Sequence, residues 1–492
     1  MADRPPAKAS TLTQRAVRGA AWTLPTSLAS RAIGLVGTLL LARFLVPADY
    51  GEVSAASIVA LTASSITAFG IGVYLVANRD LTRAEAFHAT VFFLAAGVVA
   101  LSAAYALAGP LGRWSDATEL ARYMPTLLAA TVLDRVSYVP ERMLVRKLRF
   151  RWLSIARACS ELVFTGVSVA LAAAGVGAMA IAWGSLARSG VKFLLIVPAV
   201  ERREWLEPHR LELATMRKIV GYGLNVSASA IATFAMRRWD NLLISRYYGP
   251  ATMGAYNYAY NLADTPAVAI GEQMSDVIAA SLPHAEMDKR AAALVRSCTL
   301  ISLIMFPLAF GLGAVAPTVV ATFFNEKWRS VGTMLVYLSV LSAPRPIFNI
   351  LQSYFYSSGR PRLVLWLEWL SLGGIVLALM TIGRISTDWA CGAVGAIFVL
   401  RTLAGIWAVK RNDRVPMSEF LVPLLRPLAA CALMVAAIVL VRPLIAEWSP
   451  ARRLVIEVVV GAIAYLVSVL VIARSASRDF LQLLRSALGR RS

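Results

Sequence analysis

The segment LLLARFLVPADYGEV (39–53) recurs without gaps as LLISRYYGPATMGAY (242–256), 203 residues further along the chain. The identical pairs include an arginine, a proline and a glycine at the same spacing: Leu39/Leu242, Leu40/Leu243, Arg43/Arg246, Pro47/Pro250, Ala48/Ala251 and Gly51/Gly254. Each copy ends one long apolar run and begins the next, which argues against a chance likeness of two short turns. Because the offset covers six such runs, both copies have the same orientation. The sequence therefore predicts a parallel duplication of the kind that transporters use.

The composition around this repeat indicates a membrane protein. Of the 492 residues, 58% are hydrophobic and 16% are charged, and the mean hydropathy is +0.65. Soluble chains are usually about 45–50% apolar and about 25% charged, so a soluble fold of this size would expose large apolar patches. The net charge of +21 would suggest a nucleic-acid partner for a soluble protein. Here we expect instead an all-α integral membrane protein with no nucleic-acid partner.

Apolar runs long enough to cross a bilayer, about 20 residues each, divide the chain into helices and short loops. We predict fourteen transmembrane helices: 19–45, 52–77, 86–108, 121–143, 152–174, 177–200, 218–248, 251–283, 295–322, 329–357, 362–383, 388–409, 422–445 and 452–474. The loops on the N-terminal side, counted together with the adjoining span ends, hold 29 of the 49 Lys and Arg residues, and those on the other side hold 10. Since positively charged loops stay in the cytoplasm, we expect a multi-pass inner-membrane protein with both termini cytoplasmic.

The duplication and the polar loops predict how the chain is divided. We expect two pseudo-symmetric six-helix bundles joined by a polar linker and followed by an appended C-terminal helix pair, with a basic cytoplasmic tail at each end. The predicted boundaries are 1–18 (tail), 19–200 (first bundle), 201–217 (linker), 218–409 (second bundle), 410–474 (helices 13 and 14) and 475–492 (tail).

Two long stretches resemble a known family. GAAWTLPTSLASRAIGLVGTLLLARFLVPADYGEVSAASIVALTASSITAFGIGVYLV (19–76) resembles the opening of the polysaccharide (oligosaccharide) flippases of the multidrug/oligosaccharidyl-lipid/polysaccharide exporter superfamily. GPATMGAYNYAYNLADTPAVAIGEQMSDVIAASLPH (249–284) is similar to the eighth span of these proteins. The resemblance implies a two-lobed flippase of 12–14 spans for exopolysaccharide or O-antigen synthesis. Its partners would be undecaprenyl-diphosphate-linked oligosaccharide, membrane lipids, and the polymerase and chain-length proteins of the same pathway.

Ten Lys or Arg residues lie inside the predicted spans and away from the span ends, where an ionisable group costs about 2.5–3.5 kcal/mol and normally faces a cavity or the bundle interior. The resemblance singles out Arg31, in SRAIG of the first span, as similar to an arginine that other members present to substrate phosphate. A guanidinium suits a diphosphate because its planar fork can donate two parallel hydrogen bonds. The alternative is that Arg31 pairs with Asp264 or Glu272 across the bundle.

Three further arginines are candidates for the same cavity. Arg237 and Arg238 are adjacent in the seventh span, and Arg345 lies between Pro344 and Pro346, where the helix must break. Arg345 can therefore either contact substrate or brace the break.

Other charges inside the spans are expected to neutralise one another. Arg157 and Glu161 are four residues apart on one predicted helix, a spacing at which opposite charges pair. Asp134 and Arg135 are adjacent and are expected to be partly self-neutralised.

Span 8 carries a polar stripe at helical spacing, formed by Asn257, Tyr260, Asn261, Asp264, Glu272 and Asp276. Amide, phenol and carboxylate groups suit sugar hydroxyls, and a carboxylate can also take a coupling proton. The alternative is a seam that joins two helices through polar groups. Flippases of the peptidoglycan precursor lipid II have a basic residue where this chain has Asn261, in YAYNL, which favours another oligosaccharide.

The sequence gives no sign of an enzyme. It contains no GxxxxGK[ST], GxSxG or HExxH pattern, and its four cysteines and three histidines are scattered, so no catalytic residue, metal or cofactor is predicted. The predicted outer loops are too short for a polysaccharide polymerase or transferase. Two alternatives within the same fold remain open, a cation-coupled multidrug exporter and a lipid II flippase.

Overall fold

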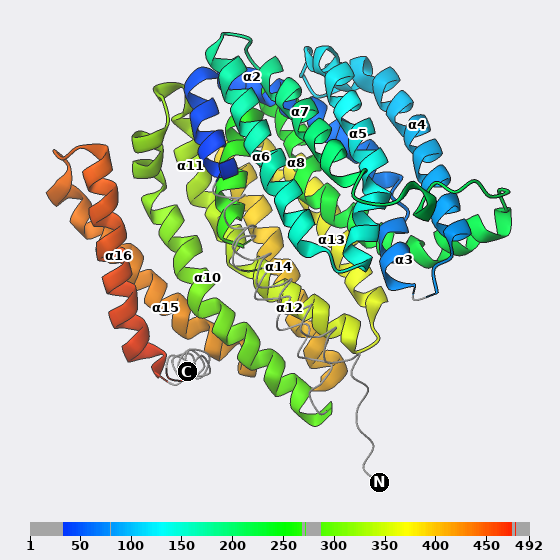
Figure 1. Ribbon diagram of the computed structural model, residues 1–492. Helices are drawn as coiled ribbons and strands as arrows, with labels where there is room; N and C mark the ends of the chain where they lie inside the picture. The colour runs from blue at the N-terminus through cyan, green and yellow to red at the C-terminus, as the bar shows by residue number, and fades with distance from the viewer. Residues whose placement is uncertain (1–32, 79, 268–270, 272–286, 475–477, 479–492) are drawn as a thin grey trace, which may run out of the picture. The chain divides into compact units, whose positions relative to one another are not determined.

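The computed structural model describes residues 33–78, 80–267, 271, 287–474 and 478, and in this part of the chain it contains helices and loops without a β-strand (Figure 1). The predicted all-α class is thus confirmed. Among the described residues, nine helices are long and apolar enough to cross a membrane, and a bent helix pair would make a tenth. The count of fourteen stays a prediction, because the predicted spans 19–45 and 251–283 extend beyond the described residues.

The chain divides into two compact units, Met1–Gly254 and Ala255–Ser492. The helices of the first unit are a short apolar helix Ile33–Phe44, α2 (Pro47–Ile66), α3 (Ile71–Ala77), α4 (Arg83–Trp114), α5 (Leu120–Arg146), α6 (Phe150–Ala173), α7 (Met179–Ile196), η1 (Arg202–Glu204) and most of α8 (Leu213–Pro266). α6 packs along α7, and α5 packs against both (Figure 1). α8 is two helices, because Gly249 has a φ of 78° and interrupts it. That break lies where the sequence predicts one span to end and the next to begin.

The two copies of the repeat fold alike and touch each other. Pro47 begins α2, and Pro250 follows the break in α8 in the same way. A Cβ atom on Gly51 would lie 1.9 Å from the Pro250 carbonyl oxygen, and one on Gly254 would lie 2.0 Å from the Pro47 carbonyl oxygen. Equivalent residues of the two copies thus make reciprocal contacts. The two helix starts cross so closely that only glycine, which has no side chain, fits at positions 51 and 254.

A bend of 49° separates α2 from α3, and a buried arginine binds the end of α2 at this bend. Arg135 of α5, 3% exposed, donates to the Thr67 hydroxyl (2.9 Å), the Ser64 carbonyl (3.3 Å) and the Phe93 carbonyl (2.7 Å). Ser64 lies in the last turn of α2, where the helix dipole favours a cation. Arg135 therefore stabilises the break instead of pairing with the adjacent Asp134, which accepts from Ser189 at 2.8 Å. The expected self-neutralisation is wrong, because consecutive helical residues face different directions.

The segment predicted as a linker packs on the first unit. Trp205 is 2% exposed, and its carbonyl accepts a hydrogen bond from Thr90 of α4 at 3.1 Å. Lys147 pairs with Glu204 at 2.5 Å, and Arg83 pairs with Glu207 at 3.0 Å. Apolar burial and these bonds hold the segment between α7 and α8 in place.

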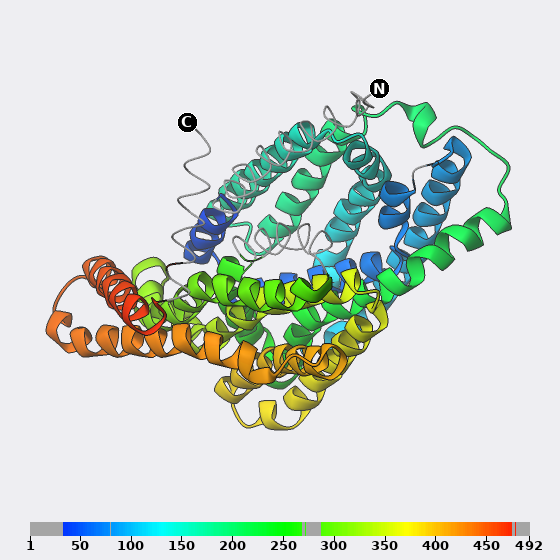
Figure 2. The same cartoon turned by 90° about the horizontal axis from the view of Figure 1, so that it is seen from below.

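The second unit contains the end of α8 and the following elements: α10 (Met287–Phe323), η4 (Glu326–Trp328), α11 (Ser330–Leu338), η5 (Ser339–Ser342), α12 (Pro344–Ser357), α13 (Pro361–Met380), η6 (Ile382–Arg384), α14 (Thr387–Asp413), α15 (Met417–Val441), η7 (Arg442–Ile445) and α16 (Pro450–Ile472). α15 and α16 run side by side and both pack against α10 (Figures 1 and 2). Their apolar residues join those of α10, α12 and α14 in one core.

Candidate functional site

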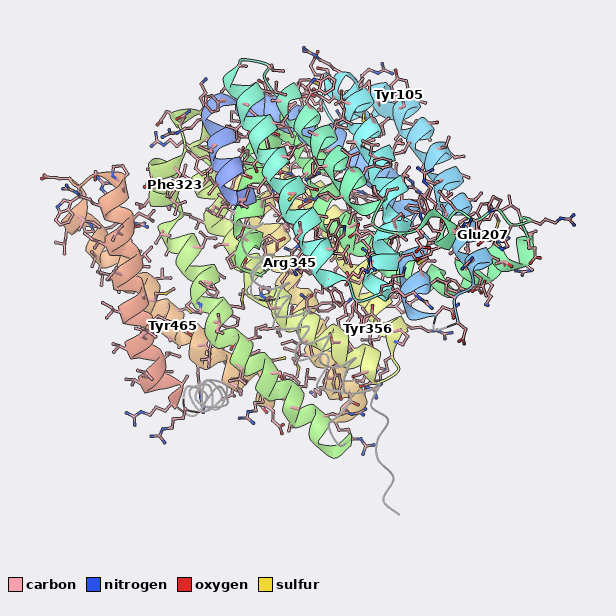
Figure 3. All side chains as sticks on the ribbon, in the orientation of Figure 1. Tyr105, Glu207, Phe323, Arg345, Tyr356 and Tyr465 are labelled. Atoms are coloured by element: carbon pink, nitrogen blue, oxygen red, sulfur yellow. The ribbon has the colours of Figure 1, made fainter. Side chains whose placement is uncertain are left out.

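Arg345 lies at the helix break that Pro344 and Pro346 predict. The 3₁₀ turn η5 ends at Ser342, and α12 begins at Pro344. Proline has no N–H to donate, so the carbonyls one turn earlier need other partners. The Val340 carbonyl accepts from the N–H of Ala343 in the 3₁₀ turn, at 3.2 Å. Arg345 is the second residue of α12, and in the view of Figure 3 it lies between Phe323, at the end of α10, and Tyr356, near the end of α12.

The Arg345 guanidinium binds two residues of α8. It forms an ion pair with the Asp264 carboxylate and donates a hydrogen bond to the Tyr260 hydroxyl at 2.7 Å. Its charged carbon lies 4.8 Å from the centre of the Phe398 ring of α14. Arg345 is 5% exposed, so this buried charge is balanced by a carboxylate and covered by aromatic rings. Of the predicted candidates, the structure brings Tyr260, Asp264 and Arg345 together, and in this arrangement Arg345 connects α12 to α8.

Two asparagines lie close to this group on the same helix. The Asn261 amide donates to the Asn257 amide oxygen at 2.7 Å, and the Thr265 hydroxyl donates to the Asn261 carbonyl at 2.8 Å. Asn257 is 3% exposed, whereas Asn261 is half-buried. The amide of Asn261 is thus the more accessible of the two. This part of the stripe offers hydrogen-bond donors and acceptors next to a charged pair.

The remaining candidates lie elsewhere. Arg237 and Arg238 are half-buried residues of α8 in the first unit. Arg31 and Glu272, together with Asp276 of the predicted stripe, lie outside the described residues. The role of each of these residues stays a prediction.

A cluster of charges on α5, α6 and α7 was not predicted as a group. Glu141 receives hydrogen bonds from Arg157 at 3.1 Å and Arg142 at 3.2 Å, and Lys192 pairs with it at 3.0 Å. The expected pair of Arg157 with Glu161 is wrong, because Arg157 turns to α5 instead. A spacing of four residues can predict an ion pair only within one helix. The charges around Glu141 come from three helices, so the sequence could not show that they meet.

A second buried ion pair joins two helices that are long and apolar enough to cross a membrane. Arg401 of α14 pairs with Glu368 of α13, and the two side chains are 7% and 1% exposed. The Arg401 guanidinium also lies 3.6 Å from the centre of the Phe348 ring. Both charges are visible in the sequence, but their partnership depends on how α13 and α14 pack.

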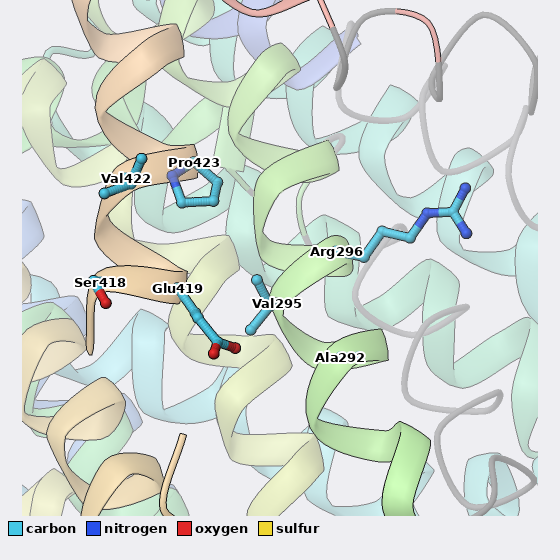
Figure 4. Close-up of a pocket in the computed structure, with 7 residues that line it drawn as sticks. All are labelled: Ala292, Val295, Arg296, Ser418, Glu419, Val422 and Pro423. Atoms are coloured by element: carbon cyan, nitrogen blue, oxygen red, sulfur yellow. The ribbon is translucent and has the colours of Figure 1, made fainter. Parts of the chain in front are cut away.

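Two pockets lie away from the predicted candidates. One of about 550 Å³ lies between α10 and α15, and in Figure 4 Glu419 and Val295 face each other across it while Arg296 extends away. The other, of about 340 Å³, has both His88 and His209 in its wall. The backbone N–H of Glu212 donates to Nε2 of His88 at 2.9 Å, and Nδ1 lies 2.6 Å from the Ala84 carbonyl, which fits a neutral imidazole with its proton on Nδ1.

Comparisons with known proteins identify the family. A family model described as "Polysaccharide biosynthesis protein" matches residues 40–332. The succinoglycan biosynthesis transport protein ExoT of Rhizobium meliloti (strain 1021) is 24% identical over 494 residues, covering 95% of each chain. The lipopolysaccharide biosynthesis protein WzxC of Escherichia coli (strain K12) is 23% identical over 353 residues, covering 71% of each chain.

A solved structure shows a similar fold. The structure of "Lipid II flippase MurJ, inward closed conformation" matches with a TM-score of 0.73 at 14% identity, covering 91% of this chain and 98% of that chain. At this identity the likeness concerns the fold alone. The family model, in contrast, matches more than half of the sequence, and the chain therefore belongs to the family of polysaccharide biosynthesis proteins.

Proposed function

We propose that the protein is a flippase that moves undecaprenyl-diphosphate-linked oligosaccharide repeat units across the bacterial inner membrane, for exopolysaccharide or O-antigen synthesis. The observation that carries this proposal is the similarity along 95% of both chains to a succinoglycan biosynthesis transport protein. The fold supports it, since the helices of a two-unit transporter can open alternately to each face. No covalent bond changes in such transport, so the protein needs no catalytic residue.

In this proposal the polar residues at membrane depth receive the headgroup. Arginines bind the diphosphate, and the amide and phenol groups of α8 bind sugar hydroxyls. The proposed cavity residues are Arg31, Arg237, Arg238, Asn257, Tyr260, Asn261, Asp264, Glu272 and Arg345. Asp264 is already paired with Arg345, so an anionic substrate would compete with this carboxylate for the guanidinium. The lipid tail would stay in the bilayer.

We also propose a topology of fourteen spans with both termini in the cytoplasm. The excess of Lys and Arg in the loops on the N-terminal side supports it. The two predicted bundles, 19–200 and 218–409, would form the two lobes, and residues 410–474 would add a helix pair. The polymerase and chain-length proteins of the same pathway are proposed partners.

Deletion of the gene tests the proposed function directly. We expect lipid-linked oligosaccharide to accumulate on the cytoplasmic leaflet, because its polar headgroup crosses the apolar core slowly without a carrier. The measurement is the amount of lipid-linked intermediate accessible from each face of inverted and right-side-out vesicles. Normal surface glycan together with hypersensitivity to drugs would contradict the flippase and favour the multidrug exporter.

Substitution of Arg345 tests whether this residue binds substrate or only stabilises the helix break before α12. Arg345→Lys keeps the positive charge beside Asp264 but loses the fork that reaches both Asp264 and Tyr260. A hydrogen bond to a charged group contributes about 1.5–3 kcal/mol, so transport should fall about 10- to 100-fold, while the protein should still fold. The measurement is the transport rate in vesicles together with the melting temperature.

The matched control is the neutral double variant Arg345→Met with Asp264→Asn, which removes both charges of the pair. Transport at the wild-type rate in this double variant would show that transport does not need the charges of Arg345 and Asp264. It would also remove Arg345 from the substrate site.

A further inference from the structure

Three cations from three helices converge on one buried carboxylate in the first unit. Oε1 of Glu141 accepts from Arg142 at 3.2 Å and Arg157 at 3.1 Å, and Oε2 lies 3.0 Å from Nζ of Lys192. Nζ of Lys192 also lies 3.3 Å from Asp134. The group, here named the Glu141 cluster (Asp134, Glu141, Arg142, Arg157 and Lys192), contains three positive and two negative charges. It therefore keeps a net positive charge.

Within the Glu141 cluster, Arg157 faces outward and Glu141 faces inward. The Glu141 side chain is 9% exposed, whereas those of Lys192 and Arg157 are 26% and 64% exposed. Arg157 has five N–H donors, and within the described residues it uses one of them, toward Glu141. The accessible surface of the cluster thus consists of the unused N–H donors of Arg157 and, in part, of the Asp134 carboxylate, which is 39% exposed and pairs with Lys192. The net positive charge of the cluster still favours a multivalent anion.

The cluster lies close to one end of the three helices. Glu141 precedes the end of α5 by five residues, Arg157 follows the start of α6 by seven, and Lys192 precedes the end of α7 by four. At 1.5 Å per residue these positions lie about 6–11 Å inside the helix ends. α5 and α6 are joined at this end by the basic segment 146–151, which the proposed topology places in the cytoplasm. A headgroup arriving from the cytoplasmic leaflet would meet the cluster early in its path.

We propose that Arg142, Arg157 and Lys192 form a binding site for the diphosphate group of a lipid at the cytoplasmic end of the first unit. Glu141 is the internal counter-ion, which holds the three cations together in the empty site and competes with the ligand. Planar guanidinium groups can contact two phosphate oxygens at once, and the ammonium group adds a third donor. The lipid nature of this ligand rests on the proposed function, and none of these residues belongs to the cavity proposed above.

If Glu141 acts as a counter-ion, its substitution should change the affinity for diphosphate in the opposite direction to the substitution of a cation. Lys192→Gln and Arg157→Gln should each weaken the binding of inorganic diphosphate to the purified, full-length protein about tenfold. Glu141→Gln should strengthen it about tenfold, because it removes the competing negative charge and leaves the cations. The measurement is isothermal titration calorimetry in detergent, with the melting temperature recorded for each variant. A purely structural network would lose melting temperature in all three variants without any change in affinity, and this result would overturn the site.

Two controls keep the test specific. Arg122→Gln removes an exposed cation at the opposite end of α5, where Arg122 pairs with Glu119 at 3.5 Å; an equal loss of affinity there would indicate a general charge effect and overturn the site. Arg157 is mostly exposed, so Arg157→Gln should fold even if Glu141→Gln does not. In that case the double variant Glu141→Gln with Lys192→Gln, which keeps the net charge of the cluster, should bind diphosphate more tightly than Lys192→Gln alone.

A second set of titrations distinguishes the sources of the diphosphate. Undecaprenyl diphosphate in nanodiscs should show the same order of affinities among the variants as inorganic diphosphate. A response to inorganic diphosphate alone would overturn the lipid assignment. If binding follows the predicted order but gene deletion leaves the lipid-linked intermediates unchanged, the proposed flippase function fails while the anion site stands. If deletion causes accumulation but all variants bind diphosphate like the wild type, the site fails and the function stands.

Discussion

Gly51→Ala and Gly254→Ala are each expected to prevent the protein from accumulating in folded form. The new Cβ atoms would lie 1.9 Å and 2.0 Å from the carbonyl oxygens of Pro250 and Pro47. These are backbone atoms at the starts of two helices, so neither can rotate away as a side chain would. Overpacking a core usually costs about 1–3 kcal/mol, and moving two helix starts apart should exceed that range. The measurement is the yield and melting temperature of monodisperse protein after solubilisation.

The matched control is Gly166→Ala in α6. Gly166 has no atom within 4 Å of the position of a new Cβ, and alanine is favoured over glycine in a helix interior by about 1 kcal/mol. The same chemical change should therefore be neutral or stabilising there. Equal yields of Gly51→Ala, Gly254→Ala and Gly166→Ala would contradict the close crossing of the two repeat copies.

Arg401→Met is expected to destabilise the second unit by about 3–5 kcal/mol, because it removes the guanidinium from a buried ion pair. Glu368 is fully buried, and its carboxylate would lose its cationic partner at membrane depth. The double variant Arg401→Met with Glu368→Met should recover most of the loss, since apolar residues of similar volume often replace a buried ion pair without cost. Thermal unfolding in detergent measures both effects.

An exposed ion pair serves as the control for Arg401. Arg329 and Glu326 lie 3.3 Å apart with side chains 85% and 84% exposed, and exposed pairs contribute about 0–1 kcal/mol. Arg329→Met should therefore leave the melting temperature nearly unchanged. If the double variant at Arg401 and Glu368 is no more stable than Arg401→Met alone, the loss comes from packing around Arg401 and not from the unpaired carboxylate.

The candidate site was only partly predictable. The sequence singled out Tyr260, Asp264 and Arg345 by their polarity, and the structure brings these three side chains together. The sequence also named Arg31 as an alternative partner of Asp264; Arg31 lies outside the described residues, and within them Asp264 pairs with Arg345. A carboxylate in one helix has several cations available along the sequence. Only the packing of α8 against α12 shows which of them comes within bonding distance.

In the Glu141 cluster, too, the sequence does not predict which charges pair. The spacing of Arg157 and Glu161 favours a pair on one helix, which contributes only about 0.2–0.5 kcal/mol. Arg157 instead joins Arg142 and Lys192 around Glu141, whose carboxylate is buried, so that its attraction to the surrounding cations is less screened by water. The weak local preference is overruled by contacts between α5, α6 and α7.

By itself, the sequence determined the properties that depend on local chemistry. The apolar content specifies a membrane class, the glycine and proline positions specify the breaks at Gly249 and before Pro344, and the repeat specifies two equivalent helix starts. The tertiary structure alone decided which charges meet. Long side chains at membrane depth must find partners, and the helices that supply these partners lie far apart in the sequence, so helix packing and not residue spacing selects each pair.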